Sequence, residues 1–118
     1  MNDETGALLL TADARIEVIS LPASNSLPTM RTALGCGMVD VLRLSDHLDM
    51  WFDDEYLYNY AGQPNTLATE IARRFQPGAS TILGPVLLTG IDQSTGETLP
   101  LTVDRLRMLL SAVLGSVS

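Results

Sequence analysis

The sequence predicts an α+β fold, with a mostly antiparallel sheet, two to three helices packed on it, and a single domain. Short apolar runs that alternate with polar residues, as in half-buried strands, fill much of the first 60 positions. Two segments, 26–35 and 65–75, have helical spacing with start and stop signals. A chain of 118 residues, 46% hydrophobic, suits one buried core. We expect a flexible N-terminal tail over residues 1–6 and the domain over residues 7–118.

The first two expected strands form a hairpin. Residues 7–11 and 15–21 flank a turn-like segment at 12–14. Within the second strand Ile16 and Val18 alternate with polar residues, so one face of the strand is expected to be buried.

A short helix is expected next, over residues 26–35. Ser26 can cap it, Pro28 suits its first turn, and Gly35 is a typical C-terminal stop. One face of this helix carries Leu27, Met30 and Leu34.

Residues 37–60 are expected to form the centre of the sheet, as three strands over 38–44, 47–54 and 55–60 with a turn near 53–55. In the middle strand, alternation assigns one face to the core and the other to solvent. The core face carries Leu48, Met50 and Phe52, and the outward face carries His47, Asp49, Trp51 and Asp53.

The second half of the chain alternates helices with strands. Asn65 or Thr66 is expected to cap a helix that ends near Phe75, before the breaker at 76–78. Residues 81–90 indicate a buried strand, and the proline within it predicts an edge position or a bulge. Residues 91–100 are expected to form a polar hairpin loop or a short strand pair, and Thr102 then caps a C-terminal helix. The apolar stripe of that helix is Val103, Leu106, Leu110 and Val113, which fits core packing or self-association as a homodimer.

The charge balance excludes one class of partner. The net charge is −7, from 14 acidic residues against seven arginines and no lysine. Binding to DNA or RNA is therefore not expected, because phosphate neutralisation needs clustered basic residues. Without a signal-peptide pattern or an apolar run of membrane-spanning length, a cytoplasmic location in a bacterial cell is expected.

No catalytic, cofactor or metal pattern emerges. His47 is the only histidine, and no nucleophile elbow accompanies it. Cys36 is the only cysteine, so an intramolecular disulfide is excluded, and its two glycine neighbours favour a small buried residue at a tight junction. One histidine, one cysteine and scattered carboxylates do not match a zinc or calcium pattern. The glycines around Cys36 precede a strand rather than the helix that a phosphate-binding loop requires.

Residues 45–55 hold an uneven cluster of five carboxylates without a lysine or an arginine. In the expected register, Asp49 and Asp53 flank Trp51 on the outward face, which would make a contact patch for a partner. The alternative is a solvated strand face. The candidate binding residues are Asp46, Asp49, Trp51, Asp53, Asp54, Glu55 and, at the helix cap, Asn65. For Asn65 the architectural role of a cap is favoured, with a ligand-facing amide as the alternative.

Several segments together resemble the family catalogued as domain of unknown function 3846, over about residues 8–92. They are the strand RIEVISL, the helix and strand in LGCGMVDVLRL, the turn at DDE, the segment QPNTLAT and the strand ILGPVLLTG. In the family's pattern, Gly37 and Asp40 match the turn and strand after the first helix, and Asn65 and Ala68 match the later helix start. The pattern's acidic pair is followed by glycine, whereas Tyr56 follows Asp54 and Glu55 in this chain, so this turn must differ. The isoleucine and glycine of the family's last strand match Ile82 and Gly84, with Leu83 inserted between them.

The resemblance implies a genetic setting in bacteriophages, plasmids and their hosts, and implies no particular activity. We therefore expect a non-catalytic binding protein that modulates a host defence factor. It would act on a protein through its acidic surface or on a small signalling molecule through a pocket. Two alternatives stay open. One is an enzyme with a dispersed site made of Asp40, His47, Asp49 and Asn65, and the other is a structural subunit of a larger assembly.

Overall fold

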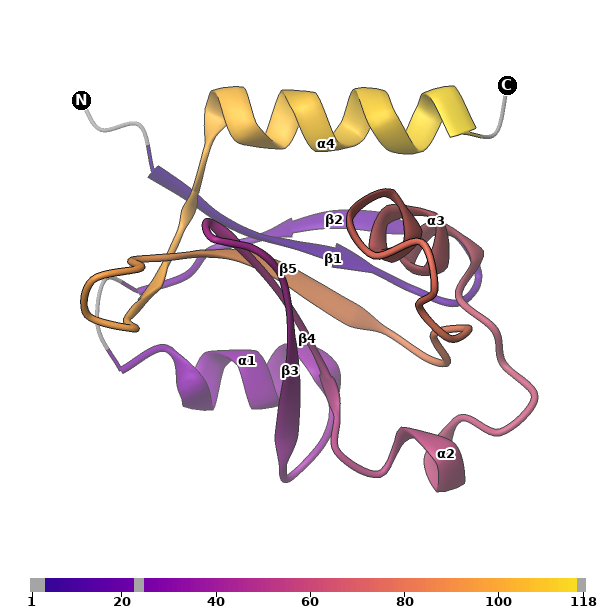
Figure 1. Cartoon of the computed structure of the whole chain (residues 1–118). Helices are drawn as coiled ribbons and strands as arrows, with labels where there is room; N and C mark the ends of the chain where they lie inside the picture. Colours follow the sequence, from indigo (N-terminus) through magenta and orange to yellow (C-terminus); the bar gives the residue numbers. More distant parts are fainter. Residues whose placement is uncertain (1–3, 23–24, 117–118) are drawn as a thin grey trace.

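The computed structural model describes residues 4–22 and 25–116, and its centre is an antiparallel sheet (Figure 1). The strands are β1 (Glu4–Leu10), β2 (Ile16–Ile19), β3 (Val39–Ser45), β4 (Leu48–Asp53), β5 (Val86–Ile91), β6 (Thr98–Leu99) and β7 (Leu101–Thr102). The main path of the sheet runs β2-β1-β5-β4-β3, while β6 pairs with β5 and β7 pairs with β1. Every strand pairing in the described part of the chain is antiparallel, which confirms the predicted α+β class.

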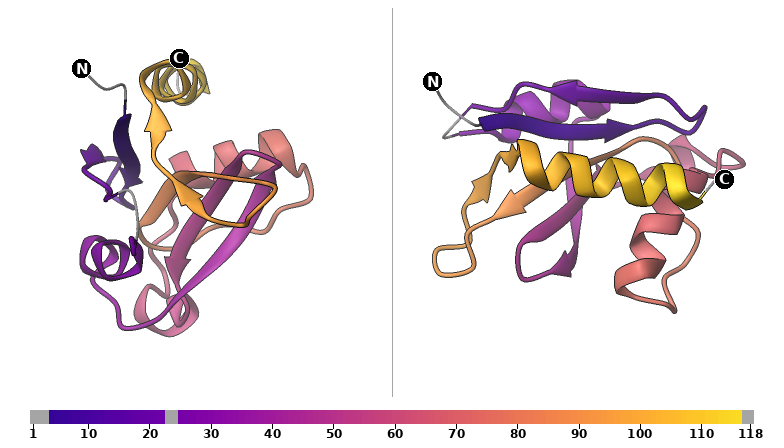
Figure 2. Two further views of the ribbon diagram at one scale, coloured as in Figure 1. Left: turned by 90° about the vertical axis from the view of Figure 1, so that its left-hand side faces the viewer. Right: turned by 90° about the horizontal axis from the view of Figure 1, so that it is seen from above.

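Helices cover both faces of the sheet. They are α1 (Leu27–Leu34), α2 (Tyr56–Asn59), α3 (Thr66–Phe75) and α4 (Val103–Ser116). Helix α1 lies on one face, whereas α3 and α4 lie on the other, with α3 beside the C-terminal end of α4 (Figures 1 and 2). Each face therefore has its own apolar core. The α1 core includes Ala7, Leu9, Met30, Leu34 and Leu87, and the α3 core includes Leu8, Leu10, Met50, Ile71 and Leu88.

The N-terminal hairpin forms as expected, with Leu8 opposite Val18. The prediction of a tail over residues 1–6 is corrected in part, because β1 begins at Glu4; residues 1–3 lie outside the described residues. The start of β1 belongs to the sheet because it pairs with β7, a pairing that links the two ends of the chain and is invisible to local patterns.

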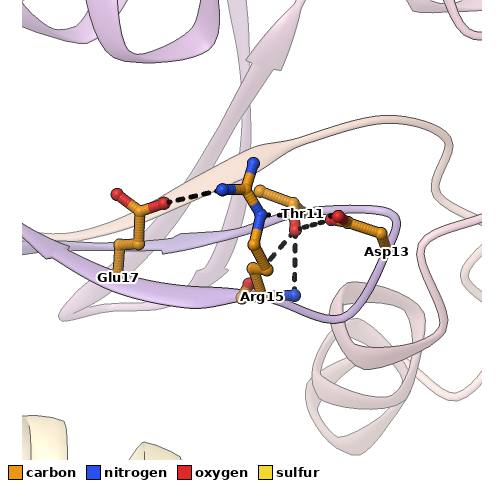
Figure 3. A network of polar contacts seen from close by, with 4 residues as sticks. All are labelled: Thr11, Asp13, Arg15 and Glu17. Carbon is orange, nitrogen blue, oxygen red and sulfur yellow. Dashed lines mark hydrogen bonds and ion pairs between the residues drawn. The ribbon is translucent and has the colours of Figure 1, made fainter.

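The hairpin turn between β1 and β2 is held by polar contacts (Figure 3). The Thr11 hydroxyl donates to the Asp13 carboxylate and accepts the N–H of Arg15 at 2.9 Å. The Arg15 guanidinium lies 3.4 Å from Asp13 and 3.6 Å from Glu17. The hydrogen bond from Thr11 and the charge of Arg15 lower the pKa of Asp13. These contacts account for the local geometry of an exposed turn.

Helices α1 and α3 begin and end close to the predicted residues. Gly35 ends α1 in the left-handed conformation, with φ of 68°. Ser26 precedes α1, but its hydroxyl makes no capping hydrogen bond. Asn65 caps α3, where its Oδ1 accepts the N–H of Ala68 at 3.0 Å.

Two strand predictions are wrong. Residues 55–60 alternate like a strand, but Tyr56–Asn59 form the short helix α2. Pro85 predicts an edge position or a bulge for the strand after α3, but β5 is central and begins just after that proline. Pro85 therefore occupies no ladder position, and all six residues of β5 are buried.

Helix α4 starts after Thr102, whose hydroxyl accepts the N–H of Arg105 at 3.2 Å. Of its predicted apolar stripe, Leu106 is buried and Leu110 packs against the α3 core, whereas Val103 is 40% exposed. The side chain of Val113 lies outside the described part. In the described ranges, no helix combines the length and apolar character needed to cross a bilayer.

Candidate functional site

The face of β4 that alternation assigns to solvent lies inside the fold. Asp49 is 2% exposed and Asp53 is 4% exposed, while Trp51 packs against the α1 core. The predicted contact patch, with two carboxylates flanking an outward tryptophan, is therefore not present. Alternation along a strand distinguishes two faces but does not say that a helix covers the second one.

The buried polar groups of this face are bonded to neighbouring side chains. The Arg43 Nε donates to Oδ1 of Asp49 at 3.0 Å, a contact between cross-strand neighbours on β3 and β4. The indole N–H of Trp51 donates to Oγ1 of Thr89 on β5 at 2.9 Å. These pairs satisfy polar groups inside the fold, where an unpaired one would be costly.

Asp53 holds α2 against the end of the sheet. Its Oδ1 accepts the N–H of Glu55, and its Oδ2 accepts the side-chain amide of Asn59, both at 2.8 Å. The N–H of Asp54 donates to the carbonyl oxygen of Met38 at 3.0 Å, which ties the same turn to the start of β3. This buried carboxylate is why the tyrosine-rich segment turns into a helix instead of continuing as a strand.

The anchored turn exposes an unusual set of side chains, which we call the α2 surface. It comprises Met38, Asp54, Glu55, Leu57 and Tyr58. Met38 and Leu57 are each 65% exposed and Tyr58 is 87% exposed. Helix α2 lies at the periphery of the fold, clear of α3 and α4 (Figure 1). The set therefore combines two exposed carboxylates with three large side chains that the fold itself does not bury.

A groove of about 300 Å³ runs beside this surface. One wall is the loop 35–38 after α1, and the other is formed by Asp53, Asp54, Glu55 and Asn59. None of the described residues lining the groove is basic. The groove is therefore anionic, since three of its lining residues are carboxylates.

Cys36 lines the same groove, and its surroundings disfavour the thiolate. Partial burial of the thiol raises the pKa of Cys36, and the nearby charge of Asp53 raises it further. Both effects favour the protonated thiol, whereas a nucleophilic cysteine needs a lowered pKa. Cys36 is half-buried rather than fully buried as predicted.

Asn65 lies inside the fold, away from the α2 surface. It is 0% exposed, and its Nδ2 donates to the carbonyl oxygens of Leu10, at 3.0 Å, and Gly84, at 2.8 Å. With Oδ1 on the N–H of Ala68, the whole carboxamide is engaged. This agrees with the architectural interpretation and leaves no group for a ligand.

The structure does not bring the other candidates together. Asp46 and His47 are exposed in the turn between β3 and β4, at the opposite end of β4 from Asp54. Asp40 lies opposite Phe52 on the α3 side of the sheet, while Asp49 lies on the α1 side. Across the residues that the structure describes, no group of three or more His, Cys, Asp or Glu is arranged to hold a metal ion.

Sequence reasoning finds Asp54 and Glu55 but misses Met38, Leu57 and Tyr58. The sequence does hold a signal for the short helix. Asn59 lies six residues after Asp53, a spacing at which the Asp53 carboxylate can accept hydrogen bonds from both ends of one helical turn. The alternation of the tyrosines is the more obvious pattern, and it favours a strand.

Comparisons with known proteins agree with the resemblance seen in the sequence. The family model described as domain of unknown function (DUF3846) matches residues 4–113, which is nearly the whole chain. Neither the curated proteins nor the solved structures include a significant match. The match covers both the sheet and the helices described above, and the chain belongs to the family of domain of unknown function 3846.

Proposed function

We propose that this protein is a non-catalytic binding protein that uses the α2 surface to hold a positively charged segment of a partner protein. The observation that carries the proposal is the pairing of Asp54 and Glu55 with exposed Leu57 and Tyr58 on an anchored turn. Apolar and aromatic side chains supply most of the energy in protein interfaces, and nearby charges select the partner.

The charge of the surface defines the partner. Its carboxylates, the acidic groove beside it and the net charge of −7 all repel anions. A segment with arginine or lysine beside an apolar residue complements it, because the basic group can pair with Asp54 or Glu55 while the apolar group packs on Leu57. Long-range attraction of this kind accelerates association and weakens as salt increases.

The anchoring of the turn supports binding over catalysis. The Asp53 carboxylate holds α2 by accepting two hydrogen bonds, from the Glu55 N–H and the Asn59 amide, so the exposed side chains are presented on a preorganised element. Burial raises the pKa of Cys36, the single cysteine of the chain, which favours the thiol over the nucleophilic thiolate. The proposal includes the expected setting, in which a phage or mobile-element protein acts on a host defence factor. The partner is therefore to be sought in a lysate of the host.

Affinity capture from host lysate with matched variants tests the proposal. The test variant is Asp54→Lys combined with Glu55→Lys, and the control is Asp46→Lys combined with Glu97→Lys. Both pairs are exposed and change the net charge equally. A partner that is retained by the wild type and the control, lost by the test variant, and released by raised salt supports the proposal.

Two results would overturn it. One is a partner that binds both charge-reversed proteins equally, which would assign binding to another surface. The other is failure of the wild type to retain any protein at low salt, where electrostatic association is strongest.

A further inference from the structure

A second cavity lies on the opposite face of the same end of the sheet. Its volume is about 430 Å³, within the range of roughly 300–1,000 Å³ typical of small-molecule sites. The cavity lies between β3, the end of β4, the first residue of α2 and the segment 76–82 that follows α3. It shares no residue with the α2 surface.

The walls are mostly apolar. The apolar lining consists of Val41, Leu42, Phe52, Tyr56, Ala79 and Ile82. The rings of Phe52 and Tyr56 meet edge to face, with centroids 5.4 Å apart and planes at 83°. This pair presents a fixed aromatic corner, which favours a flat or compact apolar ligand.

Among the described residues, one charged side chain lines the cavity, that of Asp40. Asp40 lies directly opposite Phe52 across the β3–β4 pair, and its Oδ1 accepts the N–H of Val41 at 2.8 Å. That bond restrains the carboxylate. Within residues 4–22 and 25–116, no side chain or backbone group makes a hydrogen bond or ion pair with Oδ2 of Asp40. A carboxylate beside aromatic rings is the combination that recognises an organic cation, through charge and cation–π attraction.

The segment that closes the cavity is braced from outside. Arg73 Nε donates to the carbonyl oxygen of Ala79 at 3.0 Å, and Ile82 N–H donates to Oγ1 of Thr69 at 2.9 Å. Gln76 Nε2 donates to the carbonyl oxygen of Arg43 on β3 at 2.7 Å, which connects the segment to the sheet edge. The Arg73 side chain is thus bonded to the backbone of the wall and does not line the cavity. The site is therefore preformed and does not need a ligand to assemble it.

We infer that this cavity binds a small organic cation, an amine carried on an aromatic or compact apolar body. The ammonium group pairs with Oδ2 of Asp40, and the apolar body fills the corner made by Phe52 and Tyr56. An anion is excluded because the charged group that the described residues place in the lining is a carboxylate.

Three probes of similar shape test the inference on the full-length, ¹⁵N-labelled protein: phenethylamine, 2-phenylethanol and 3-phenylpropionate. We expect phenethylamine to shift the backbone amides of residues 40–42 and 78–82 saturably. The alcohol should bind more weakly at the same amides, and the carboxylate should leave them unchanged.

Variants test separately the contribution of the Asp40 charge and that of the cavity space. Asp40→Asn keeps an acceptor for Val41 and should weaken phenethylamine binding by about tenfold, the loss expected for a charge-assisted hydrogen bond. Asp46→Asn, an exposed carboxylate at the other end of β3–β4, should leave the affinity unchanged. Ala79→Phe, which fills the cavity, should abolish the shifts, with circular dichroism checking that the variant is folded.

The inference is overturned if the amine and the carboxylate bind alike, or if the shifts saturate at amides away from the cavity. It is also overturned if phenethylamine produces no saturable shift, or if folded Asp40→Asn binds it with wild-type affinity.

Discussion

The side-chain amide of Asn65 donates a 3.0 Å hydrogen bond to the carbonyl oxygen of Leu10, which lies 55 residues earlier in the chain. A second bond from the same nitrogen reaches Gly84, just before β5, and Oδ1 caps α3 through Ala68. One buried carboxamide thus joins the end of β1, the approach to β5 and the start of α3.

The substitution Asn65→Asp should destabilise the protein strongly. The introduced carboxylate would keep an acceptor for the helix cap, but it would present oxygen lone pairs, instead of N–H groups, to two carbonyl oxygens. We expect a loss of roughly 2–4 kcal/mol in the free energy of unfolding, because a buried charge is left without donors. Gln93→Glu, the same amide-to-acid change at an exposed position, is the control. Urea unfolding followed by the fluorescence of Trp51, the only tryptophan, measures both. Equal midpoints for the two variants would contradict the proposed role.

Gly84 is the second position at which the backbone near Asn65 is constrained. Its φ is +78°, and an added Cβ would lie 2.5 Å from Cγ of Tyr60. Gly84→Ala should therefore cost about 2 kcal/mol or more, since both the backbone conformation and the contact become unfavourable. Gly78→Ala, where an added Cβ meets nothing within 4 Å, is the matched control and should change stability little. Thermal unfolding by circular dichroism distinguishes them, and a Gly84→Ala protein as stable as the control would show that this bend tolerates a side chain.

Asp53 should be required for the structure of α2 rather than for the core of the fold. Asp53→Ala removes the acceptor for the Glu55 N–H and for the Asn59 amide, so we expect a loss of roughly 1–2 kcal/mol. Amide hydrogen exchange should accelerate over residues 55–60 while β5 stays protected. Asp54→Ala, an exposed neighbour, should leave exchange in α2 unchanged. Faster exchange in both variants alike would assign the effect to lost charge instead of the lost bonds.

Stability should fall at alkaline pH. Burial raises the pKa of Cys36 above 9.0 and the pKa of Tyr60 above 10.0, and the charge of Asp53 adds to both shifts. Between the unfolded and folded pKa values the folded protein binds more protons, so the free energy of unfolding decreases as pH rises. The contribution of Cys36 is complete below about pH 9 and is lost above it. The absence of lysine leaves few other groups that titrate in this range.

Urea unfolding at about pH 8 and about pH 10.5, with Cys36→Ala as the comparison, measures this dependence. The variant should lose less stability between the two values than the wild type. A wild-type protein whose stability is constant over this interval, or a variant with the same decrease, would contradict the assignment to Cys36.

Elements whose signals are local can be predicted from the amino-acid sequence. The β1–β2 hairpin follows from alternation around a short turn, and α1 and α3 follow from helical spacing bounded by Gly35 and Asn65. The cap role of Asn65 is predictable for the same reason, because a cap depends on residues within one helical turn. The family resemblance also rests on the order of such local segments.

Long-range packing determines which faces are covered and which side chains remain outside. Asp49 and Asp53 share a strand face with Trp51 as alternation requires, but this face is buried and Trp51 packs against the α1 core. No periodicity within β4 indicates where a helix packs. Tyr56–Asn59 alternate like a strand, yet two hydrogen bonds to the Asp53 carboxylate hold them as a helix and expose Leu57 and Tyr58. Pro85 indicates an edge, but the strand starts one residue later and lies at the centre of the sheet. In each case the deciding interaction joins elements that share no local pattern, so the periodicity within one element does not predict it. For that reason the α2 surface and the cavity lined by Asp40 could be found only in the folded chain.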